Sequence, residues 1–411
     1  MSTRRVGALP ADVARRVAEA RRLAREGGVA LYLAGGAVRD LLLRRPVVDI
    51  DLVVEIDAEG FARQLARALG ADLKLHRRFG TAVITLANGE HLDVATARAE
   101  EYERPGALPR VRRASITEDL LRRDFTINAM ALEIALAGRP ELLDPSGGRD
   151  DLARKLVRLL HPRSAFDDAT RAFRAVRYSD RLGFAIERES RRWILSAVAS
   201  GAADAISADR LRREVELLLS ESGRARAVRE MTALRLSRTV HRSLRFDAAV
   251  ARRLRVAERL AASREDTTWL LYLLTWMGEV STADAGEIAT RLNLPRASGR
   301  IVRAWPEVQR SLVRSAAKSA EGLAAVVERL DGDSLLAAAA GAPPGARSRI
   351  AAVSRSLRGA RLQIGGRDLV AAGVPAGPAI GRALSATRTA RRNGAIRRED
   401  ELAFALKAAR S

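Results

Sequence analysis

The change in hydrophobic periodicity along the chain constrains its fold more than any other feature. Strand-like segments occur within about the first 150 of the 411 residues, whereas almost everything after them has the three-to-four-residue spacing of amphipathic helices. This order predicts an α+β fold class, in which a small mixed sheet with helices is followed by a long all-helical region. Hydrophobic residues make up 47% of the sequence, which excludes a disordered chain.

The predicted elements of the first part are short and end at glycine, proline or acidic residues. The expected helices are 11–26, 37–45 and 58–69, and the expected strands are 29–35, 49–55, 81–86 and 91–97, with a strand-like stretch near 132–143. The polar segment 99–117 contains two prolines and a glycine and is predicted as a loop. Glycine and proline clusters at 341–346 and 373–378 predict breaks in the helical region.

The charge of the chain predicts a polyanionic partner. Lys and Arg total 72 against 50 Asp and Glu, a net charge of +22, and lysine occurs at only four positions. A GC-rich genome explains arginine in place of lysine but not the surplus of positive charge, and guanidinium groups suit phosphate. The absence of cysteine excludes a disulfide-linked partner. We expect no membrane partner and a cytoplasmic location, because no apolar run is long enough to span a bilayer and residues 1–28 lack a signal-peptide core.

Two short motifs on neighbouring predicted elements suit phosphoryl transfer. Gly35 and Gly36 lie between a strand and a helix, where backbone can approach a phosphate closely. Asp49 and Asp51 are two residues apart on the next strand, so their carboxylates share a face and repel each other unless a cation such as Mg²⁺ lies between them. Asp93 on a later strand can reach the same face. An ordinary turn and solvated strand carboxylates are the alternative interpretations.

The segment LLRRDFTINAMAL at 120–132 makes this pattern specific. Together with GGAVRD at 35–40 and DID at 49–51, it resembles the class II tRNA nucleotidyltransferase and bacterial poly(A) polymerase family. That family belongs to the DNA polymerase beta-like nucleotidyltransferases. The resemblance covers about 29–220 strongly, continues in 144–152, 166–184 and 206–219, and recurs more weakly in 362–384.

The resemblance implies an organisation and a set of site residues. The implied domains are an N-terminal helix at 1–28, a catalytic nucleotidyltransferase head at 29–143, a nucleotide-selecting helical neck at 144–222, and a tRNA-binding helical body and tail at 223–411. It implies two-metal chemistry with Mg²⁺, in which Asp49 and Asp51 hold the metal and Asp93 is a third candidate catalytic carboxylate. The implied nucleotide-binding residues are Gly35, Gly36, Arg39, Arg123, Asp124, Asn128, Asp168, Arg171, Arg174 and Arg177.

The family's base-reading motif Glu-Asp-x-x-Arg reads Asp167-Asp168-Ala169-Thr170-Arg171 here, with Asp in place of the first Glu. Asp168 and Arg171 are three apart and so share one helix face. The carboxylate can accept from the amino group of cytosine or adenine, and the guanidinium can donate to the neighbouring ring nitrogen. Guanine and uracil present a carbonyl and an N–H there, so both contacts fail. An intrahelical ion pair without a reading role is the alternative interpretation.

The resemblance thus implies an enzyme that adds C, C and A to the 3′ end of tRNA from CTP and ATP. A poly(A) polymerase, an enzyme that adds only CC or only A, and a non-catalytic RNA-binding protein remain as alternatives. The segment between Arg98 and Glu118 is close to full length for the family's flexible loop, which favours complete CCA addition. The arginine-rich helices of 225–411 are expected to contact the phosphates of the tRNA.

Overall fold

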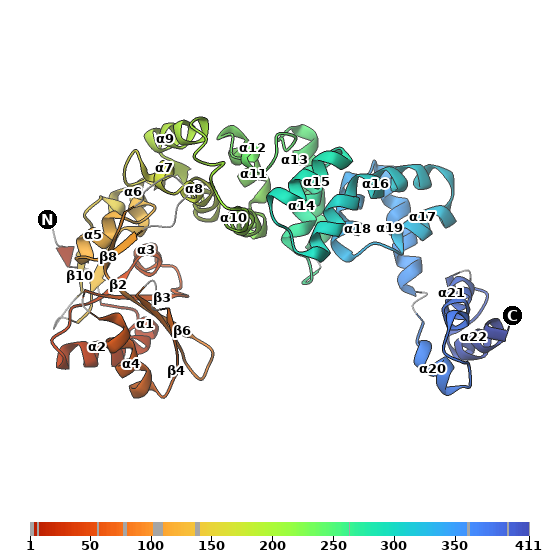
Figure 1. Ribbon diagram of the computed structural model, residues 1–411, viewed down its shortest axis with the longest axis horizontal. Helices are drawn as coiled ribbons and strands as arrows, with labels where there is room; N and C mark the ends of the chain where they lie inside the picture. The colour runs from red at the N-terminus through yellow and green to blue at the C-terminus, as the bar shows by residue number, and fades with distance from the viewer. Residues whose placement is uncertain are drawn as a thin grey trace. The chain divides into compact units, whose positions relative to one another are not determined.

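The computed structural model describes residues 4–5, 8–55, 57–76, 80–101, 110–135, 140–262, 264–359, 362–392 and 394–410. The chain divides into two units, Met1–Arg242 and Ser243–Ser411. All strands of the described residues lie in the first unit, and the second unit consists of helices (Figure 1). The predicted α+β order is therefore confirmed. Among the described helices, none combines the length and apolar character needed to cross a membrane.

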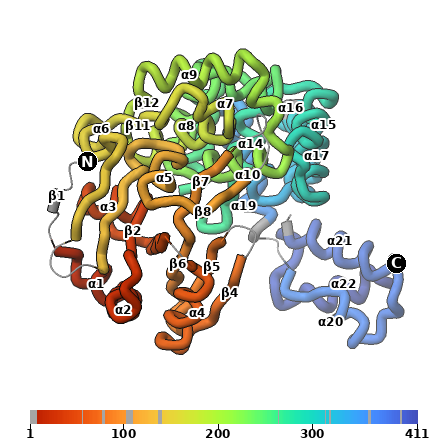
Figure 2. The backbone as a smooth tube through the Cα atoms, turned by 60° about the vertical axis from the view of Figure 1, so that its left-hand side comes forward, coloured from red at the N-terminus to blue at the C-terminus, as the bar shows by residue number. Residues whose placement is uncertain are grey.

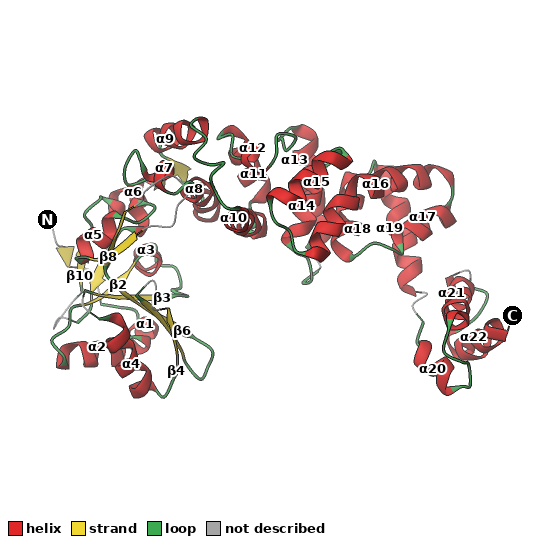
Figure 3. Cartoon of the chain, in the orientation of Figure 1, coloured by secondary structure: helices red, strands yellow, loops and turns green. Residues whose placement is uncertain are grey.

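A mixed eight-stranded sheet forms the centre of the first unit (Figure 3). Its strand order is β1-β10-β9-β2-β3-β6-β5-β4, and β3 and β6 are its one parallel pair. The strands are β1 (Arg4–Arg5), β2 (Leu31–Ala34), β3 (Ile50–Val54), β4 (Asp72–His76), β5 (Thr81–Thr85), β6 (His91–Thr96), β9 (Ala131–Glu133) and β10 (Glu141–Leu143). The predicted strands and hairpin are thereby confirmed, and the stretch near 132–143 contains two antiparallel strands.

The side chains of β2 and β3 explain why these strands lie in the middle of the sheet. All four residues of β2 are buried, and in β3 every residue except Asp51 is buried, which is typical of strands covered on both faces. The amphipathic helix α4 (Ala58–Leu69) packs against β4, β5 and β6 and ends at Gly70, whose φ of 59° is left-handed. Strand β4 was not predicted, although the residues of DLKLH alternate between polar and apolar; it is a short strand at the edge of the sheet.

Two predicted helices differ from the observed ones. The single helix expected over 11–26 is two helices, α1 (Ala11–Arg16) and α2 (Ala18–Glu26), because the backbone at Val17 leaves the helical region. Val17 is completely buried, so the break serves packing against the head. The helix expected over 37–45 is α3 (Gly36–Leu42), which stops earlier since Arg44 has a φ of 54°.

The loop prediction for 99–117 is wrong in the part that the structure describes. Strands β7 (Arg98–Glu101) and β8 (Arg110–Arg113) pair as an antiparallel ribbon. Sequence reasoning missed them because RAEE and RVRR show no apolar alternation. Across the ribbon, Arg112 Nε lies 3.7 Å from Glu101 Oε1. Helix α5 (Ile116–Leu121) follows and starts with a Ser115–Glu118 capping box. Residues 102–109, the middle of the candidate flexible loop, lie outside the described residues.

Helices make up the rest of the first unit except for a parallel pair of two-residue strands, β11 (Leu156–Val157) and β12 (Ala185–Ile186). Helix α8 packs against α10 and α11 and also contacts β11 and β12. The elements are η2 (Thr126–Asn128), α6 (Gly148–Arg154), α7 (Ser164–Asp167), α8 (Thr170–Leu182), α9 (Arg188–Ala199), α10 (Ala208–Ser220), α11 (Arg224–Ala233) and α12 (Ser237–Val240).

The second unit centres on α14 (Trp269–Met277), whose residues after Trp269 are all buried. Helices α13 (Ala248–Ala261) and α18 (Gly332–Gly341) pack against it. The predicted breaks are confirmed: α18 ends before α19 (Pro344–Gly359), and α20 (Gly366–Ala371) ends before α21 (Pro378–Arg392). Figure 2 shows α20, α21 and α22 (Glu401–Arg410) gathered together. The buried residues Leu369, Ala383 and Ala405, one from each helix, form their core. The other elements are α15 (Thr282–Arg291), α16 (Arg296–Lys318), α17 (Ala320–Val327) and η3 (Arg398–Asp400).

Candidate active site

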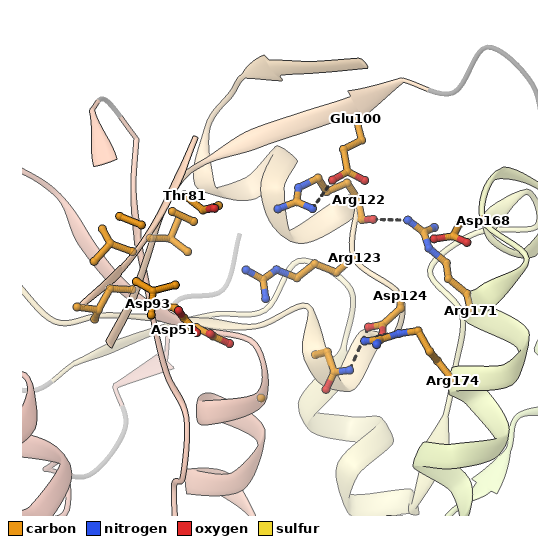
Figure 4. Close-up of a pocket in the computed structure, with 18 of the residues that line it drawn as sticks. Asp51, Thr81, Asp93, Glu100, Arg122, Arg123, Asp124, Asp168, Arg171 and Arg174 are labelled. Atoms are coloured by element: carbon orange, nitrogen blue, oxygen red, sulfur yellow. Dashed lines mark hydrogen bonds and ion pairs between the residues drawn. The ribbon is translucent and has the colours of Figure 1, made fainter. Parts of the chain in front are cut away.

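A cavity of about 500 Å³ in the first unit collects most of the residues that the sequence singled out. Its walls come from β3, β5, β6 and β7, from the segment after α5, and from α8 (Figure 4). The predicted residues in its lining are Gly36, Asp51, Asp93, Arg123, Asp124, Asn128, Asp168, Arg171 and Arg174. Gly35, Arg39, Asp49 and Arg177 are not among the lining residues.

Three carboxylates meet at the parallel pair of strands. Asp51 of β3 and Asp93 of β6 are register partners, so both side chains lie on the same face of the sheet. Asp49 directly precedes β3 and is exposed. Burial raises the pKa of Asp51, with Arg123 opposing this shift and the charges of Asp93 and Asp49 adding to it. Burial and the Asp49 charge likewise raise the pKa of Asp93.

These carboxylates suit a magnesium site of the kind that substrate completes. Within the described part of the chain, Asp49, Asp51 and Asp93 accept no hydrogen bond and form no ion pair, and no three acidic or histidine side chains form a ready-made metal cluster. Mg²⁺ is bound in proteins through one or two carboxylates together with water and substrate phosphates. A pair of unpaired carboxylates whose mutual repulsion a cation relieves therefore fits this ion.

Arg123 reaches from the segment after α5 towards Asp51 and Asp93 (Figure 4). Its Nε and Nη2 donate to Asp119 Oδ2 at 3.3 and 3.0 Å, and its Nη1 donates to no described residue. Gly35 has a φ of 70°, and a Cβ built there would collide with Arg123 Nη1 and lie 3.6 Å from Asp51 Oδ2. Glycine is therefore required by both backbone and space, and it leaves Nη1 as a free donor beside the carboxylates.

Asp119 of α5 is a residue that sequence reasoning missed. Its side chain is 1% exposed and accepts from Arg122 Nη2 at 2.6 Å as well as from Arg123. Burial would raise the pKa of Asp119, but Arg123 and Arg122 hold it below its ordinary value. Arg122 also donates to Glu100 of β7 at 2.7 Å, so the ribbon is tied to the segment that carries Arg123. The sequence signal that could have identified Asp119 is an acidic residue at a helix position that faces the protein interior.

A second buried network lies on the other side of the cavity. Asp124 accepts from Arg174 Nη2 at 2.6 Å and from the Asn128 amide at 3.0 Å. Asn128 in turn accepts from Arg39 Nη1 at 2.7 Å, while Arg39 Nε and Nη2 pair with Asp40. Arg39 is 4% exposed. Its donors are thus directed at the protein, and this arrangement supports a role in holding Asn128 and Asp124.

Tyr178 of α8 also lines the cavity and was not singled out in the sequence. Its ring meets Phe125 edge-on at 5.4 Å. The guanidinium groups of Arg39, Arg174 and Arg177 lie 5.3 to 5.5 Å from its ring centroid. The position of Arg177 is therefore against this ring, outside the cavity lining, and its buried Nε makes no hydrogen bond with the described residues.

Of the predicted base-reading pair, Arg171 lies in the first turn of α8, whereas Asp168 precedes the helix in an extended conformation, so the prediction that the two share one helix face is wrong. Arg171 is 6% exposed and its Nη2 donates to the Arg122 carbonyl at 2.7 Å (Figure 4). Asp168 accepts from Thr170 Oγ1 at 2.7 Å and from Arg210 Nη2, which is 2.8 Å from each carboxylate oxygen. Arg210 comes from α10, 42 positions along the chain. Its role has no local signal in the sequence, since it depends on how α10 packs against α8.

The chain is similar to proteins that add nucleotides to tRNA. Residues 31–158 match the family described as poly A polymerase head domain. The A-adding tRNA nucleotidyltransferase of Geobacter sulfurreducens is 36% identical over 93% of this chain and 45% of that protein. The CC-adding tRNA nucleotidyltransferase of Deinococcus radiodurans is 33% identical over 92% of this chain and 89% of that protein. The CCA-adding enzyme of Geobacillus stearothermophilus is 31% identical over 93% of both.

Solved structures extend this similarity to the whole chain. An apo form of a CCA-adding enzyme has a TM-score of 0.84 at 26% identity and covers 100% of both chains. The Thermotoga maritima CCA-adding enzyme complexed with tRNA has a TM-score of 0.79 at 25% identity, again over 100% of both chains. This chain spans less than half the length of the A-adding relatives it matches.

Proposed function

The chain belongs to the class II tRNA nucleotidyltransferase family, and on that premise we propose that it adds C, C and A to the 3′ end of tRNA from CTP and ATP, without a template. Its proposed partners are therefore a tRNA 3′ end and the two nucleotides, and its proposed location is the cytoplasm. The observation that carries the proposal is the single cavity, which joins Asp51, Asp93 and Arg123 to Asp168 and Arg171.

The catalytic end of the cavity supports nucleotidyl transfer. The RNA 3′-oxygen forms a bond to the α-phosphorus of the nucleotide, the bond from that phosphorus to the bridging oxygen breaks, and pyrophosphate leaves. Asp49 and Asp51 would hold Mg²⁺, which would supply charge neutralisation and a more acidic 3′-hydroxyl. Arg123, oriented by Asp119, presents Nη1 to the phosphates, and Asp93 is the proposed acceptor of the hydroxyl proton because its pKa is raised.

The other end of the cavity supports selection of the base. Asp168 accepts from the amino group of cytosine or adenine, and Arg171 donates to the ring nitrogen beside it. Both side chains are already held by other residues, Asp168 by Arg210 and Arg171 by the Arg122 carbonyl. Side chains that are held in place before the base binds favour a rigid base-selecting site over an adaptable pocket.

Addition of A alone is a second candidate. The A-adding relative from Geobacter sulfurreducens is 36% identical over most of this chain, whereas the CCA-adding relative from Geobacillus stearothermophilus is 31% identical. The length of the segment between Arg98 and Glu118 is the reason to prefer complete CCA addition. The middle of that segment lies outside the described residues, so the preference rests on its length.

An extension assay tests these candidates. Purified protein with Mg²⁺ is given tRNA transcripts that end before CCA, after C, or after CC, with each nucleotide separately and then together. We expect stepwise addition that stops at CCA. Addition of A only to the CC-ended transcript identifies an A-adding enzyme, arrest at CC identifies a CC-adding enzyme, and long A-tails identify a poly(A) polymerase.

Asp49→Ala separates catalysis from binding. We expect this variant to lose nucleotide addition while it binds tRNA as the parent does, since Asp49 is exposed and forms no ion pair with the described residues. Filter binding with labelled tRNA measures the affinity for tRNA. Parental protein that binds tRNA but incorporates no nucleotide in the extension assay would instead be an RNA-binding protein on an inactive head.

A further inference from the structure

Arg16, the last residue of α1, contacts the backbone that leads directly to Asp49. Its Nη1 donates to the Val47 carbonyl and its Nη2 to the Val48 carbonyl, both at 2.8 Å. The Arg16 side chain is 14% exposed. A planar guanidinium that binds two consecutive carbonyls fixes both the position and the direction of that backbone.

The segment that Arg16 binds is held by few contacts besides the burial of Val47, which is 7% exposed. In the described structure, no other side chain and no loop backbone group donates to or accepts from the backbone of residues 46–49. Arg44, with its φ of 54°, turns the chain away from α3, and Val48 is 71% exposed. Asp49 therefore follows a stretch whose conformation depends on Arg16.

Arg16 also reaches the strand that carries Asp93. Its Nε lies 3.6 Å from Glu90 Oε2, and Glu90 directly precedes β6. The Glu90 backbone is itself fixed, since its carbonyl accepts from Leu86 N at 2.8 Å in the hairpin turn. One side chain thus connects the residues just before Asp49 with those just before the strand of Asp93.

Helix α1 is a rigid base for these contacts. Val13 is 1% exposed and Val17, directly after the helix, is fully buried, so the helix is anchored in the core on either side of Arg16. The carboxylates need such support, because Asp49, Asp51 and Asp93 repel one another and no described side chain forms an ion pair with them, although Arg123 offsets part of this repulsion at Asp51. Without Arg16, the segment before Asp49 keeps the burial of Val47 but loses its side-chain hydrogen bonds.

We propose that Arg16 is a positioning residue, which sets the place of Asp49 and, through Glu90, its spacing from Asp93. The N-terminal helix then serves the active site as well as the fold. The inference rests on the proposed function in that Asp49 and Asp51 are taken as the metal-binding pair. A shift of about 1 Å in such a group costs up to about 100-fold in rate, so a contact of this kind has a measurable effect.

The test compares Arg16→Gln with a matched control, Arg21→Gln. Arg21 on α2 also donates to a head carbonyl, that of Ile134 at 2.8 Å, but Ile134 follows β9 and is remote in sequence from the acidic strands. Arg16→Gln removes two hydrogen bonds and the Glu90 contact, and Arg21→Gln removes one hydrogen bond, each between an N-terminal helix and the head. If Arg16 acts on stability alone, Arg16→Gln lowers the free energy of unfolding but leaves kcat and Mn²⁺ affinity as they are in Arg21→Gln.

Three quantities are measured on the full chain. We expect Arg16→Gln to lower kcat for nucleotide addition about tenfold with an unchanged KM for CTP and ATP, and to weaken Mn²⁺ affinity about tenfold, the low end for loss of a residue that orients a metal ligand. Mn²⁺ affinity is read by electron paramagnetic resonance with CTP and without tRNA, because the site is of the kind that substrate completes. Hydrogen exchange of the peptides covering 47–55 should accelerate in Arg16→Gln and not in Arg21→Gln.

Arg16→Lys adds a finer test, because it keeps the charge but reaches one carbonyl at a time. We expect its kcat between those of the parent and Arg16→Gln. Equal changes in Arg16→Gln and Arg21→Gln, or parental kcat, Mn²⁺ affinity and exchange in Arg16→Gln, would overturn the proposal. If the parent binds Mn²⁺ but adds no nucleotide, the proposed function fails while the Mn²⁺ and exchange readouts still decide the role of Arg16.

Discussion

Asp168 depends for its orientation on a residue outside its own motif. Arg210 of α10 places Nη2 at 2.8 Å from both carboxylate oxygens, and Thr170 adds two further donors to Oδ1. Because Oδ1 accepts from three donors and Oδ2 from one, Oδ2 is the oxygen that can accept a further hydrogen bond. A carboxylate that is held in this way offers one direction to the amino group of an incoming base.

We therefore expect Arg210→Gln to reduce discrimination between nucleotides. Loss of the contact lets Asp168 rotate, and misincorporation of U and G should rise about 10- to 100-fold relative to C and A, the range for a hydrogen bond to a charged group. Competition assays with paired nucleotides measure the ratio. Arg213→Gln on the exposed side of α10 is the control. An unchanged ratio in Arg210→Gln would show that Asp168 is oriented without it.

In the protein without metal, the ionised Asp51 carboxylate lowers the free energy of unfolding. Burial raises its pKa, so the folded state binds the proton more tightly than the unfolded state does. The contribution of Asp51 to the free energy of unfolding therefore falls as pH rises from about 4, the unfolded value, through the folded pKa. At neutral pH the ionised carboxylate destabilises the fold.

Asp51→Asn should accordingly unfold at a higher urea concentration than the parent at pH 7, measured without divalent metal. Activity should fall by at least about 100-fold, since a group that stabilises the transition state is lost. The stability gain should shrink as the pH approaches 4. A variant that is less stable than the parent at pH 7 would show that Arg123 outweighs the cost of burying this charge.

Among the elements, α8 is joined to the segment between α5 and η2 by a buried ion pair. Arg174 of α8 donates to Asp124 Oδ2 through Nε at 2.9 Å and Nη2 at 2.6 Å, and the Asp124 side chain is 10% exposed. Burial would raise the pKa of Asp124, but Arg174 and the Asn128 hydrogen bond lower it. This pair connects the elements that carry the two ends of the cavity.

Arg174→Met should lower the free energy of unfolding by about 3 kcal/mol, at the low end for a buried pair because the Arg174 side chain is 32% exposed. The same pair makes stability depend on pH: its contribution is complete above about pH 4 and is lost as pH falls through the lowered pKa of Asp124. Urea denaturation between pH 2 and 7 tests both statements. Parallel pH profiles for the variant and the parent would contradict the predicted pH dependence of the Arg174–Asp124 pair.

The whole molecule carries a net charge of +22, which favours binding of a polyanion. Arginines without an ion-pair partner among the described residues follow the exposed face of α13 at Arg252, Arg255 and Arg259. Positions three and four apart lie on one side of a helix, as a phosphate backbone requires.

Affinity for tRNA should consequently fall steeply with salt, by about 1,000-fold or more between about 50 and about 200 mM, as for proteins that contact six to ten phosphates. Replacing Arg252, Arg255 and Arg259 together with Gln should reduce the slope of log affinity against log salt. Fluorescence anisotropy with labelled tRNA measures that slope. An unchanged slope would exclude this face of α13 from the contact.

By itself, the sequence determined the fold class, the central strands and the motif residues. Hydrophobic periodicity is a local property, so β2, β3, α4 and the hairpin of β5 and β6 were predictable. The same holds for Asp51 and Asp93, because alternation along a strand places side chains on known faces. Strands β7 and β8 were missed because RAEE and RVRR lack that alternation, and β4 was missed although its five residues alternate.

Only the tertiary structure decided which groups orient the site. Asp119 holds Arg123, Arg210 holds Asp168, and Arg16 holds the backbone before Asp49. It also placed Arg39 in a buried network with Asp40 and Asn128 and not in the cavity lining. The physical reason is that a hydrogen bond or ion pair depends on distances of about 3 Å. Those distances are set by the packing of elements far apart in the chain, which no local pattern records.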